Sequence, residues 1–302
     1  MLNLNNAELS SSPFNWFVVD NVIDEDLFHE AREEVKTIFD NIKKIDVAYV
    51  DHCEYFDSNF PPGESNIIGG LSNTKTDPAE IVLNVTKNGG ALERLCKEFL
   101  KKNQQNNLYR LLVPFSIFDL KSICPVKIHL KNEEMSIFDY IFFKNCYVNL
   151  KLSSYTSNFG IHQHKDHENK VTALLFYFGF SDKIQRNGCS TQIYEVTKGN
   201  ENWSKKETPP TLDYQDDQKL NLVKEVNCLP NRLFGFRKTR DSWHGVDYHQ
   251  LPSGVRREAL QINLMKHYKS SVNLRRLLTV INHIKSFFRP IVKKYLISKK
   301  TH

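Results

Sequence analysis

The sequence predicts an α+β protein whose antiparallel β core follows a partly helical N-terminal region. Between Cys146 and residue 268, short apolar or alternating runs follow one another with turns between them and no helical periodicity. In the N-terminal part, apolar residues instead recur at helical spacing in several segments. About six short strands without intervening helices are typical of a β-sandwich or jelly roll.

Length and composition predict a globular protein with one main domain in three parts. The 302 residues can bury a large core, and 40% apolar with 25% charged residues is ordinary for such a protein. We expect a helical and strand support region over residues 1–145 and the β core over 146–268. Residues 269–302 are expected to form a basic amphipathic C-terminal helix.

The positive charge of the chain is concentrated at its C-terminus. The net charge is +6, but residues 271–302 carry eight lysines and arginines, which leaves 33 basic against 35 acidic residues in the rest. A near-neutral body argues against nucleic acid as a partner. The tail fits either a helix packed on the domain with solvated lysines or a peripheral contact with an anionic membrane.

The cysteines and the N-terminus indicate a cytoplasmic protein with free thiols. None of the six cysteines lies in a C-x-x-C pair, so a thiolate zinc site is not expected. The N-terminus lacks the basic and apolar segments of a signal peptide, and no run of about 18 apolar residues could span a membrane. If the tail binds lipid, the protein would lie at the inner membrane face.

Helices are expected in three N-terminal segments. A strand at 16–20 precedes a helix that Asp24 caps, with its apolar face between Leu27 and Phe39. Asp77 followed by proline marks a second helix start, and residues 90–102 are expected to form a third helix.

Other N-terminal segments give weaker signals. Residues 103–107 indicate a polar break, and 109–118 and 136–143 indicate strands or short helices. Residues 44–76 lack periodicity, which predicts a loop that is either a functional lid or an irregular connection.

The strands of the β core are expected at 147–154, 171–178, 191–196, 220–228, 232–236 and 259–265. The run 171–178 is continuously apolar, which predicts burial on both faces of a sheet. Residues 197–217 are polar and contain two adjacent prolines, which predicts an inserted loop.

Two histidines and a carboxylate form the strongest candidate for a chemical site. His164 and Asp166 form an H-x-D pair just before the 171–178 run, and His244 follows far downstream. On an extended segment, residues two apart share a face, so both could bind one metal. Two histidines and one carboxylate can hold one face of a non-haem Fe(II) and leave the other open. Taken alone, however, an H-x-D pair is more often a solvated polar turn.

Several motifs extend this pair into an ordered set. His164-x-Asp166 is followed by Asn-Gly-Cys-Ser-Thr-Gln-Ile-Tyr at 187–194, Ser-Trp-His-Gly-Val at 242–246 and Arg-Arg-Glu-Ala-Leu at 256–260. In this order the motifs resemble those of the 2-oxoglutarate- and Fe(II)-dependent dioxygenases, in particular the prolyl-4-hydroxylase-like branch with its bacterial and phage members. The resemblance covers roughly 147–266 and implies a double-stranded β-helix, a jelly roll, as the catalytic core with helices beside it.

Carried over residue by residue, the resemblance makes His164, Asp166 and His244 the iron ligands. It gives Arg257 the role of pairing with the distal carboxylate of 2-oxoglutarate, because a guanidinium forks onto a carboxylate through two charge-assisted hydrogen bonds. Tyr177 matches a tyrosine whose hydroxyl reaches the same carboxylate, or it is a core aromatic.

Some neighbours of these residues remain open alternatives. Arg256 competes with Arg257, but the spacing Arg257-x-x-Leu260 matches the family, and strand alternation puts Arg256 on the opposite face. Lys170 either meets a substrate anion or solvates a turn. His162 shares the strand face of His164, so it either lies at the rim or supports the metal ligands, while His167 and His249 are expected in solvent.

The implied cofactors are Fe(II), 2-oxoglutarate as co-substrate, and O2, with ascorbate as a further candidate. The implied reaction oxidatively decarboxylates 2-oxoglutarate to succinate and CO2 and hydroxylates a substrate C–H bond. The carboxylate of Asp166 argues against halogenation, because the related halogenating enzymes lack one at this position. The sequence departs from the family at Gly188, which Cys189 and Ser190 separate from Thr191. This departure bears on substrate choice more than on metal binding.

Three functions are compatible with the sequence. The first is a hydroxylase of a small molecule, a cell-surface glycan or a lipid-linked sugar. The second is a protein or peptide side-chain hydroxylase of the prolyl-hydroxylase type. The third is a non-enzymatic jelly-roll binding protein, against which the intact triad and Arg257 argue.

Overall fold

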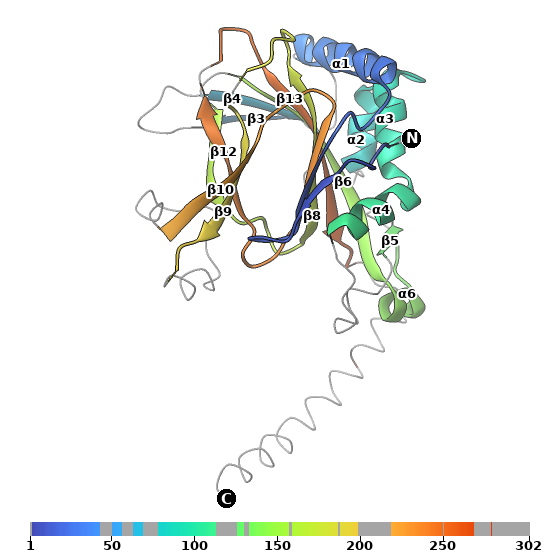
Figure 1. Ribbon diagram of the computed structural model, residues 1–302. Helices are drawn as coiled ribbons and strands as arrows, with labels where there is room; N and C mark the ends of the chain where they lie inside the picture. The colour runs from blue at the N-terminus through green and yellow to red at the C-terminus, as the bar shows by residue number, and fades with distance from the viewer. Residues whose placement is uncertain are drawn as a thin grey trace, which may run out of the picture.

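Two facing sheets, with helices on one side, make up the body of the protein (Figure 1). The structure is a computed structural model that describes residues 2–42, 50–55, 63–68, 78–112, 126–129, 133–156, 159–186, 188–198, 219–249, 251–268 and 279. The 269–302 helix and the 197–217 loop that the sequence predicts lie outside this part, apart from Thr197, Lys198 and Thr279. Within the described residues, no helix is both long and apolar enough to cross a membrane.

Eight consecutive strands form the core and alternate between the two sheets. They are β6 (Lys144–Tyr155), β7 (Phe159–His164), β8 (Lys170–Phe180), β9 (Thr191–Val196), β10 (Leu220–Val226), β11 (Arg232–Arg237), β12 (Trp243–His249) and β13 (Arg257–Lys266). The smaller sheet has the order β10-β9-β12-β7, and the larger sheet contains β11-β8-β13-β6. The chain changes sheet at every connection except that between β9 and β10. This arrangement is a double-stranded β-helix, so the predicted fold class is confirmed.

N-terminal strands extend the larger sheet on both sides of the core. On one side lie β1 (Glu8–Ser10) and β2 (Trp16–Asp20), which pairs with β11. On the other lie β3 (Val50–Tyr55) and β4 (Gly63–Ile68), which pairs with β6, while β5 (Val126–His129) runs parallel to β6. Strands from both sides of residue 146 therefore share one sheet.

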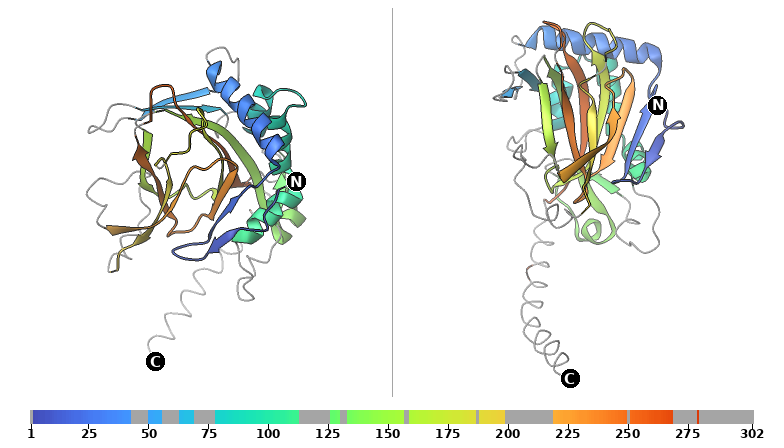
Figure 2. Two further views of the ribbon diagram at one scale, coloured as in Figure 1. Left: turned by 45° about the horizontal axis from the view of Figure 1, so that its top comes forward. Right: turned by 60° about the vertical axis from the view of Figure 1, so that its left-hand side comes forward.

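Helices cover the outer face of the larger sheet (Figures 1 and 2). They are α1 (Glu25–Asp40), α2 (Pro78–Val85), α3 (Ala91–Leu100) and α4 (Lys102–Leu112), while the short α6 (Ile137–Phe142) precedes β6. The Asp24 carboxylate accepts the backbone N–H groups of Asp26 and Leu27 and so begins α1 as predicted.

Alternation along β8 explains why its apolar run is continuous. Phe176 and Phe178 face the helices, and Phe176 lies 6.2 Å from the ring of Phe28 and 5.7 Å from that of Phe99. Tyr177, which lies between these two residues in the sequence, points into the space between the sheets. The predicted burial of this strand on both faces is confirmed, because one face meets helices and the other meets the smaller sheet.

The polar break predicted at 103–107 is wrong, because these residues lie within α4. Gln104 and Gln105 are buried, and their amides bond to the preceding helix: Gln104 donates to Glu98 Oε1 (3.0 Å) and Gln105 donates to the Phe99 carbonyl (2.5 Å). Buried polar groups are tolerated where they are hydrogen-bonded, so a polar helix face is compatible with the core here.

The irregular loop predicted over 44–76 is wrong for its described residues, which form the β3–β4 pair. Glu64, Ser65 and Asn66 of β4 show no apolar alternation, so no strand signal is present in the sequence. The open edge of β6 offers backbone groups that need hydrogen-bond partners, and β4 supplies them. The other residues of this segment lie outside the described part of the chain.

Replacing Phe176 by alanine should strongly destabilise the fold. Its side chain is fully buried between the larger sheet and the helices, and such a truncation costs about 3–5 kcal/mol. Urea unfolding of the variant would measure this loss. The matched control is Phe138→Ala, whose side chain is 60% exposed and whose loss should stay within about 0.5 kcal/mol. Equal losses in the two variants would contradict this account of the core.

Candidate functional site

His164 and His244 face each other across two neighbouring strands of the smaller sheet. His164 is the last residue of β7, His244 is the second residue of β12, and the two are direct partners in the antiparallel register. Their ring centroids are 4.3 Å apart. Directly opposed residues of an antiparallel pair project to the same face, so the register itself brings the two imidazoles together.

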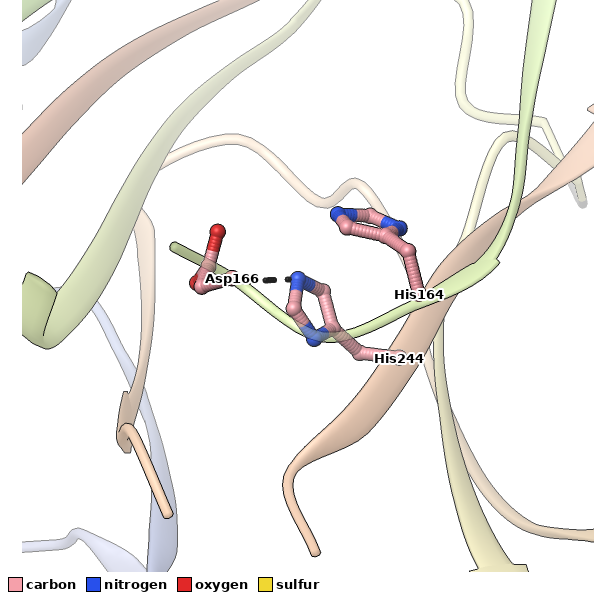
Figure 3. A group of neighbouring side chains, drawn as sticks. All are labelled: His164, Asp166 and His244. Carbon is pink, nitrogen blue, oxygen red and sulfur yellow. Dashed lines mark ion pairs between the residues drawn. The ribbon is translucent and has the colours of Figure 1, made fainter. Parts of the chain in front are cut away.

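Asp166 joins the two histidines from the turn that follows β7. Its Oδ2 atom lies 3.7 Å from His244 Nε2, and one ligand atom from each of the three residues lies within 4.8 Å of the other two. Figure 3 shows the three side chains gathered at one place, with His164 and Asp166 on one segment and His244 on its neighbour. The structure thus brings together the three residues predicted as metal ligands.

Hydrogen bonds fix which atoms of these residues are available. The Nδ1 atom of His244 lies 2.9 Å from the Ser242 carbonyl, which can only accept, so Nδ1 carries the proton and Nε2 keeps a free lone pair. Lys170 Nζ donates to Asp166 Oδ1 at 2.6 Å. The other carboxylate oxygen, Oδ2, is buried and has no hydrogen-bond partner within the described part of the chain.

The protonation states also suit metal binding. Burial lowers the pKa of His244 to about 3, and the neighbouring His164 acts in the same direction, so the imidazole is neutral at pH 7. Burial opposes ionisation of Asp166 and is the largest single influence, but the Lys170 ammonium, its hydrogen bond and the two neighbouring histidines together hold the pKa of the carboxyl below its usual range. A neutral imidazole and a carboxylate are the forms that bind divalent metals. The donor set and the unpartnered Oδ2 therefore fit a non-haem iron.

The triad opens into a cavity of about 100 Å3 between the two sheets. Apolar side chains, among them Ile161, Leu175 and Phe236, form much of its wall. The guanidinium of Arg257 lies at the same cavity, although this residue is only 2% exposed. The cavity therefore combines a metal site, an apolar wall and a buried positive charge.

The guanidinium of Arg257 is buried beside two tyrosine rings. Its guanidinium carbon lies 5.2 Å from the ring centre of Tyr177 and 5.6 Å from that of Tyr155. The Nε and Nη2 atoms have no hydrogen-bond partner among the described residues. Leaving such groups unsatisfied is costly, so this arrangement fits a carboxylate that binds between the arginine and the metal.

The choice between the two adjacent arginines follows from strand alternation. Arg256 lies on the other side, where it pairs with Asp40 (2.8 Å) and with the buried carboxylate of Glu258 (3.0 Å). Its role is therefore to hold α1 and β13 together, and only Arg257 lines the cavity.

Tyr177 lies beside Arg257 but is not among the residues that line the cavity. Its fully buried hydroxyl lies 2.7 Å from Thr191 Oγ1, and burial raises its pKa to about 12, so the phenol stays protonated. A role at the co-substrate carboxylate remains a prediction. Thr191 does line the cavity, and the departure from the family pattern precedes it as a turn with positive φ at Gly188 (95°) and Cys189 (51°).

Two cavity residues were not predicted as co-substrate contacts. Tyr155 is the direct partner of Arg257 in the β6–β13 register, and its hydroxyl accepts a hydrogen bond from Gln261 Nε2 at 3.0 Å. Gln261 shares the inward face of β13 with Arg257, four residues away. Alternation along the strand, counted from Arg257, could have identified Gln261. Tyr155 could not have been identified in this way, because its position depends on the β6–β13 register, which the sequence alone does not give.

The neighbouring residues take mostly structural positions. His167 is exposed as expected, and its ring accepts the Asn169 N–H. Trp243 is buried against Tyr194 and Leu220 in the smaller sheet. The side chains of His162 and His249 lie outside the described part of the structure. Four cysteines, Cys96, Cys146, Cys189 and Cys228, are buried free thiols.

No protein-family model and no curated protein matches the sequence. Solved structures do. The matches are 2-oxoglutarate- and Fe(II)-dependent oxygenases, the family that the motifs resemble. One is a prolyl hydroxylase from Trichoplax adhaerens in complex with a peptide of the hypoxia inducible factor oxygen degradation domain, at 9% identity, 83% coverage of both chains and a TM-score of 0.41.

Two further matches carry bound metal and co-substrate. HygX from Streptomyces hygroscopicus with nickel and 2-oxoglutarate is 11% identical, covers 86% of this chain and 89% of its own, and has a TM-score of 0.38. The epimerase SnoN with Fe3+ and alpha ketoglutarate is 9% identical, covers 86% and 84%, and has a TM-score of 0.44. At such distances the likenesses carry no functional argument, which rests on the side chains described above.

The neutral state of His244 should make the stability of the metal-free protein depend on pH. Its pKa is about 3 when folded and about 6.5 when unfolded, so the unfolded chain binds more protons between these values. The contribution of His244 to the free energy of unfolding is therefore complete above pH 6.5. As the pH drops below 6.5, this contribution decreases by up to ~1.4 kcal/mol per pH unit.

Urea unfolding of the chelated protein at pH 7, 6 and 5 would measure this slope. His244→Asn should flatten it, whereas the exposed control His29→Asn should leave it unchanged. A wild-type slope that His244→Asn does not alter would contradict the neutral buried imidazole.

Proposed function

We propose that this protein is an Fe(II)- and 2-oxoglutarate-dependent oxygenase that hydroxylates a C–H bond of a small molecule and releases succinate and CO2. One observation carries the proposal: the buried guanidinium of Arg257, whose Nε and Nη2 atoms have no hydrogen-bond partner among the described residues, shares a cavity with the triad of His164, Asp166 and His244. A metal triad alone fits many functions. A triad with a buried cation set back from it fits a co-substrate that has a carboxylate at the end away from the metal.

Each residue has a distinct role in this proposal. His164, Asp166 and His244 would hold the iron. The Ser242 carbonyl fixes the His244 tautomer, and Lys170 holds the Asp166 carboxylate through its other oxygen. Bound iron with 2-oxoglutarate would supply the oxygen-activating chemistry.

The remaining cavity residues bind and enclose. Arg257 would receive the distal carboxylate of 2-oxoglutarate in a two-pronged contact, with the rings of Tyr155 and Tyr177 beside it. The apolar wall, including Leu175 and Phe236, excludes water from the reacting groups. The modest volume between the two sheets supports a small-molecule substrate over a folded protein.

Succinate release from 2-oxoglutarate should require the triad. The wild-type protein, loaded with Fe(II) under air, should release succinate slowly even without substrate, and His164→Ala and Asp166→Ala should reduce the rate at least about 100-fold, because each removes a metal ligand. His167→Ala is the matched control on the same turn, since its side chain is exposed and outside the cavity.

The same experiment separates the enzyme from a non-enzymatic binding protein. A correctly folded wild type that binds no Fe(II) and releases no succinate would refute the proposal and favour the binding protein. Substrate-stimulated succinate release in a metabolite screen would then identify the oxidised compound, while stimulation by peptides alone would favour a peptide hydroxylase.

Arg257→Gln should weaken 2-oxoglutarate binding. The substitution removes a charge and the forked contact, and losing one or two charge-assisted hydrogen bonds of about 1.5–3 kcal/mol each reduces affinity by roughly tenfold to several hundredfold or more. The affinity of Arg257→Lys for 2-oxoglutarate should lie between those of the wild type and Arg257→Gln, because lysine keeps the charge but cannot make the forked contact.

Calorimetric titration of 2-oxoglutarate into the Mn(II)-loaded proteins would measure these affinities. Arg256→Gln serves as the control, since Arg256 directly precedes β13 and pairs with Asp40 and Glu258 away from the cavity, and thermal unfolding would confirm that each variant is folded. If Arg256→Gln lost affinity and Arg257→Gln did not, the co-substrate site would be misassigned.

A further inference from the structure

A second hollow, of about 250 Å3, adjoins the metal cavity and is strongly basic. Six of its lining residues carry positive charge: Lys144, Lys170, Arg237, Lys238, Arg240 and Lys266. Glu168 is the one acidic residue among those that line it. The chain before residue 271 has slightly more acidic than basic residues, so this concentration of positive charge does not reflect the average composition.

The topology of the larger sheet gathers these residues at one end. β6 begins at Lys144 and β8 begins at Lys170, whereas the antiparallel β11 and β13 end at Arg237 and Lys266. Backbone hydrogen bonds hold the flanking residues in place: Lys238 N donates to the Val171 carbonyl (3.0 Å), and Lys266 N donates to the Asn169 carbonyl (2.8 Å). Two basic side chains thus flank the first residues of β8, one on each side.

Little within the protein neutralises this charge. Within the described part of the chain, the side chains of Arg237, Lys238, Arg240 and Lys266 form no ion pair. Lys144 Nζ donates to the neutral hydroxyl of Tyr109 at 2.9 Å. Burial lowers the pKa of Lys238, and Lys266 and Arg240 act in the same direction, while the carboxylates of Asp166 and Glu168 oppose them. Unneutralised like charges oppose the folded state, so their gathering here is understandable if they bind an anion.

Lys170 connects the hollow to the metal site. It lines both cavities, and its ammonium contacts Asp166 Oδ1 at 2.6 Å. An anion in the hollow would therefore lie next to the turn that carries a metal ligand. A single carboxylate would not need several cations, whereas a phosphoryl group offers up to three acceptor oxygens and more than one negative charge.

Resting on the oxygenase function proposed above, we infer that the substrate carries a phosphoryl group, as a phosphate ester or a diphosphate. The basic hollow would hold that group while the carbon to be oxidised lies in the adjoining metal cavity. Arg237 and Arg240 offer forked contacts to phosphate oxygens, and Lys238 and Lys266 add charge from either side of β8.

Inorganic pyrophosphate is the probe that tests the hollow. Calorimetric titration into the full-length protein, loaded with Mn(II) and 2-oxoglutarate, should show binding. The Lys238→Gln/Lys266→Gln variant should lose at least about tenfold in affinity, because hydrogen bonds to charged groups contribute about 1.5–3 kcal/mol each.

The control is Lys87→Gln/Lys102→Gln, which removes the same charge from two exposed lysines of the helical side. If the wild type fails to bind pyrophosphate, or if both double variants lose the same affinity, the basic hollow is not a phosphoryl site. Failure of Mn(II) to bind, seen directly in its electron paramagnetic resonance signal, would instead overturn the oxygenase proposal and the catalytic role of the hollow with it.

The position of the phosphate relative to the metal can be measured independently. Mn(II) is paramagnetic, so phosphorus that binds next to the metal cavity should relax much faster in the Mn(II) protein than in the Zn(II) protein. Equal 31P relaxation rates in the two proteins would show that pyrophosphate binds elsewhere, and the inference would fail.

The source of the phosphoryl group can be distinguished by competition against pyrophosphate. Displacement by ADP would indicate a soluble diphosphate ester, and displacement only by vesicles that contain phosphatidic acid would indicate a lipid-linked phosphate; either result supports the inference. If a single-stranded oligonucleotide displaced pyrophosphate at a concentration far below that required for ADP, the hollow would be a nucleic-acid surface. This result would overturn the inference.

Discussion

The pairing of His164 with His244 in the smaller sheet is the constraint on which the site depends. The two residues are separated by 79 intervening positions in the sequence, yet the β7–β12 register makes them direct partners. A shift of one residue would send one imidazole to the opposite face of the sheet. The order β10-β9-β12-β7 fixes this register, because β12 is held on both sides, by β7 and by β9. The backbone hydrogen bonds of the sheet therefore position the two histidines that are candidate metal ligands.

The two faces of the larger sheet have different roles, because successive side chains along each strand point to opposite faces. Along β13, Leu260, Ile262 and Leu264 pack beneath the helices, while the alternate residues Arg257 and Gln261 face the cavity. The helices stabilise the outer face through apolar burial, which allows the inner face to carry polar and charged groups that contribute little to the core. Two nitrogens of Arg257 can thus remain without a hydrogen-bond partner among the described residues, because the helices anchor the strand that carries it.

Much of this was predictable from local patterns, and the exceptions have physical reasons. The strand at 191–196 and the H-x-D pair with its downstream histidine follow from alternation and motif order. The helix over 103–107 was missed because its buried glutamines are satisfied by tertiary hydrogen bonds. The strands β3 and β4 were missed because an open sheet edge, and no local pattern, creates them. Partners across strands, such as Tyr155 opposite Arg257, require a register that only the fold provides.

Charge is arranged along the path that leads from the co-substrate to the hollow. Arg257 supplies one buried cation behind the metal site, and Lys170 supplies another that is already neutralised by Asp166. Beyond Lys170 the strand ends contribute positive charge that the described residues do not neutralise. Because Lys170 is bound to Asp166, a candidate metal ligand, it could not also give its full charge to the proposed substrate anion, and the cations of β11 and β13 would have to do so. The strand ends of the larger sheet would then set substrate choice, while the smaller sheet supplies the two histidines of the candidate metal site.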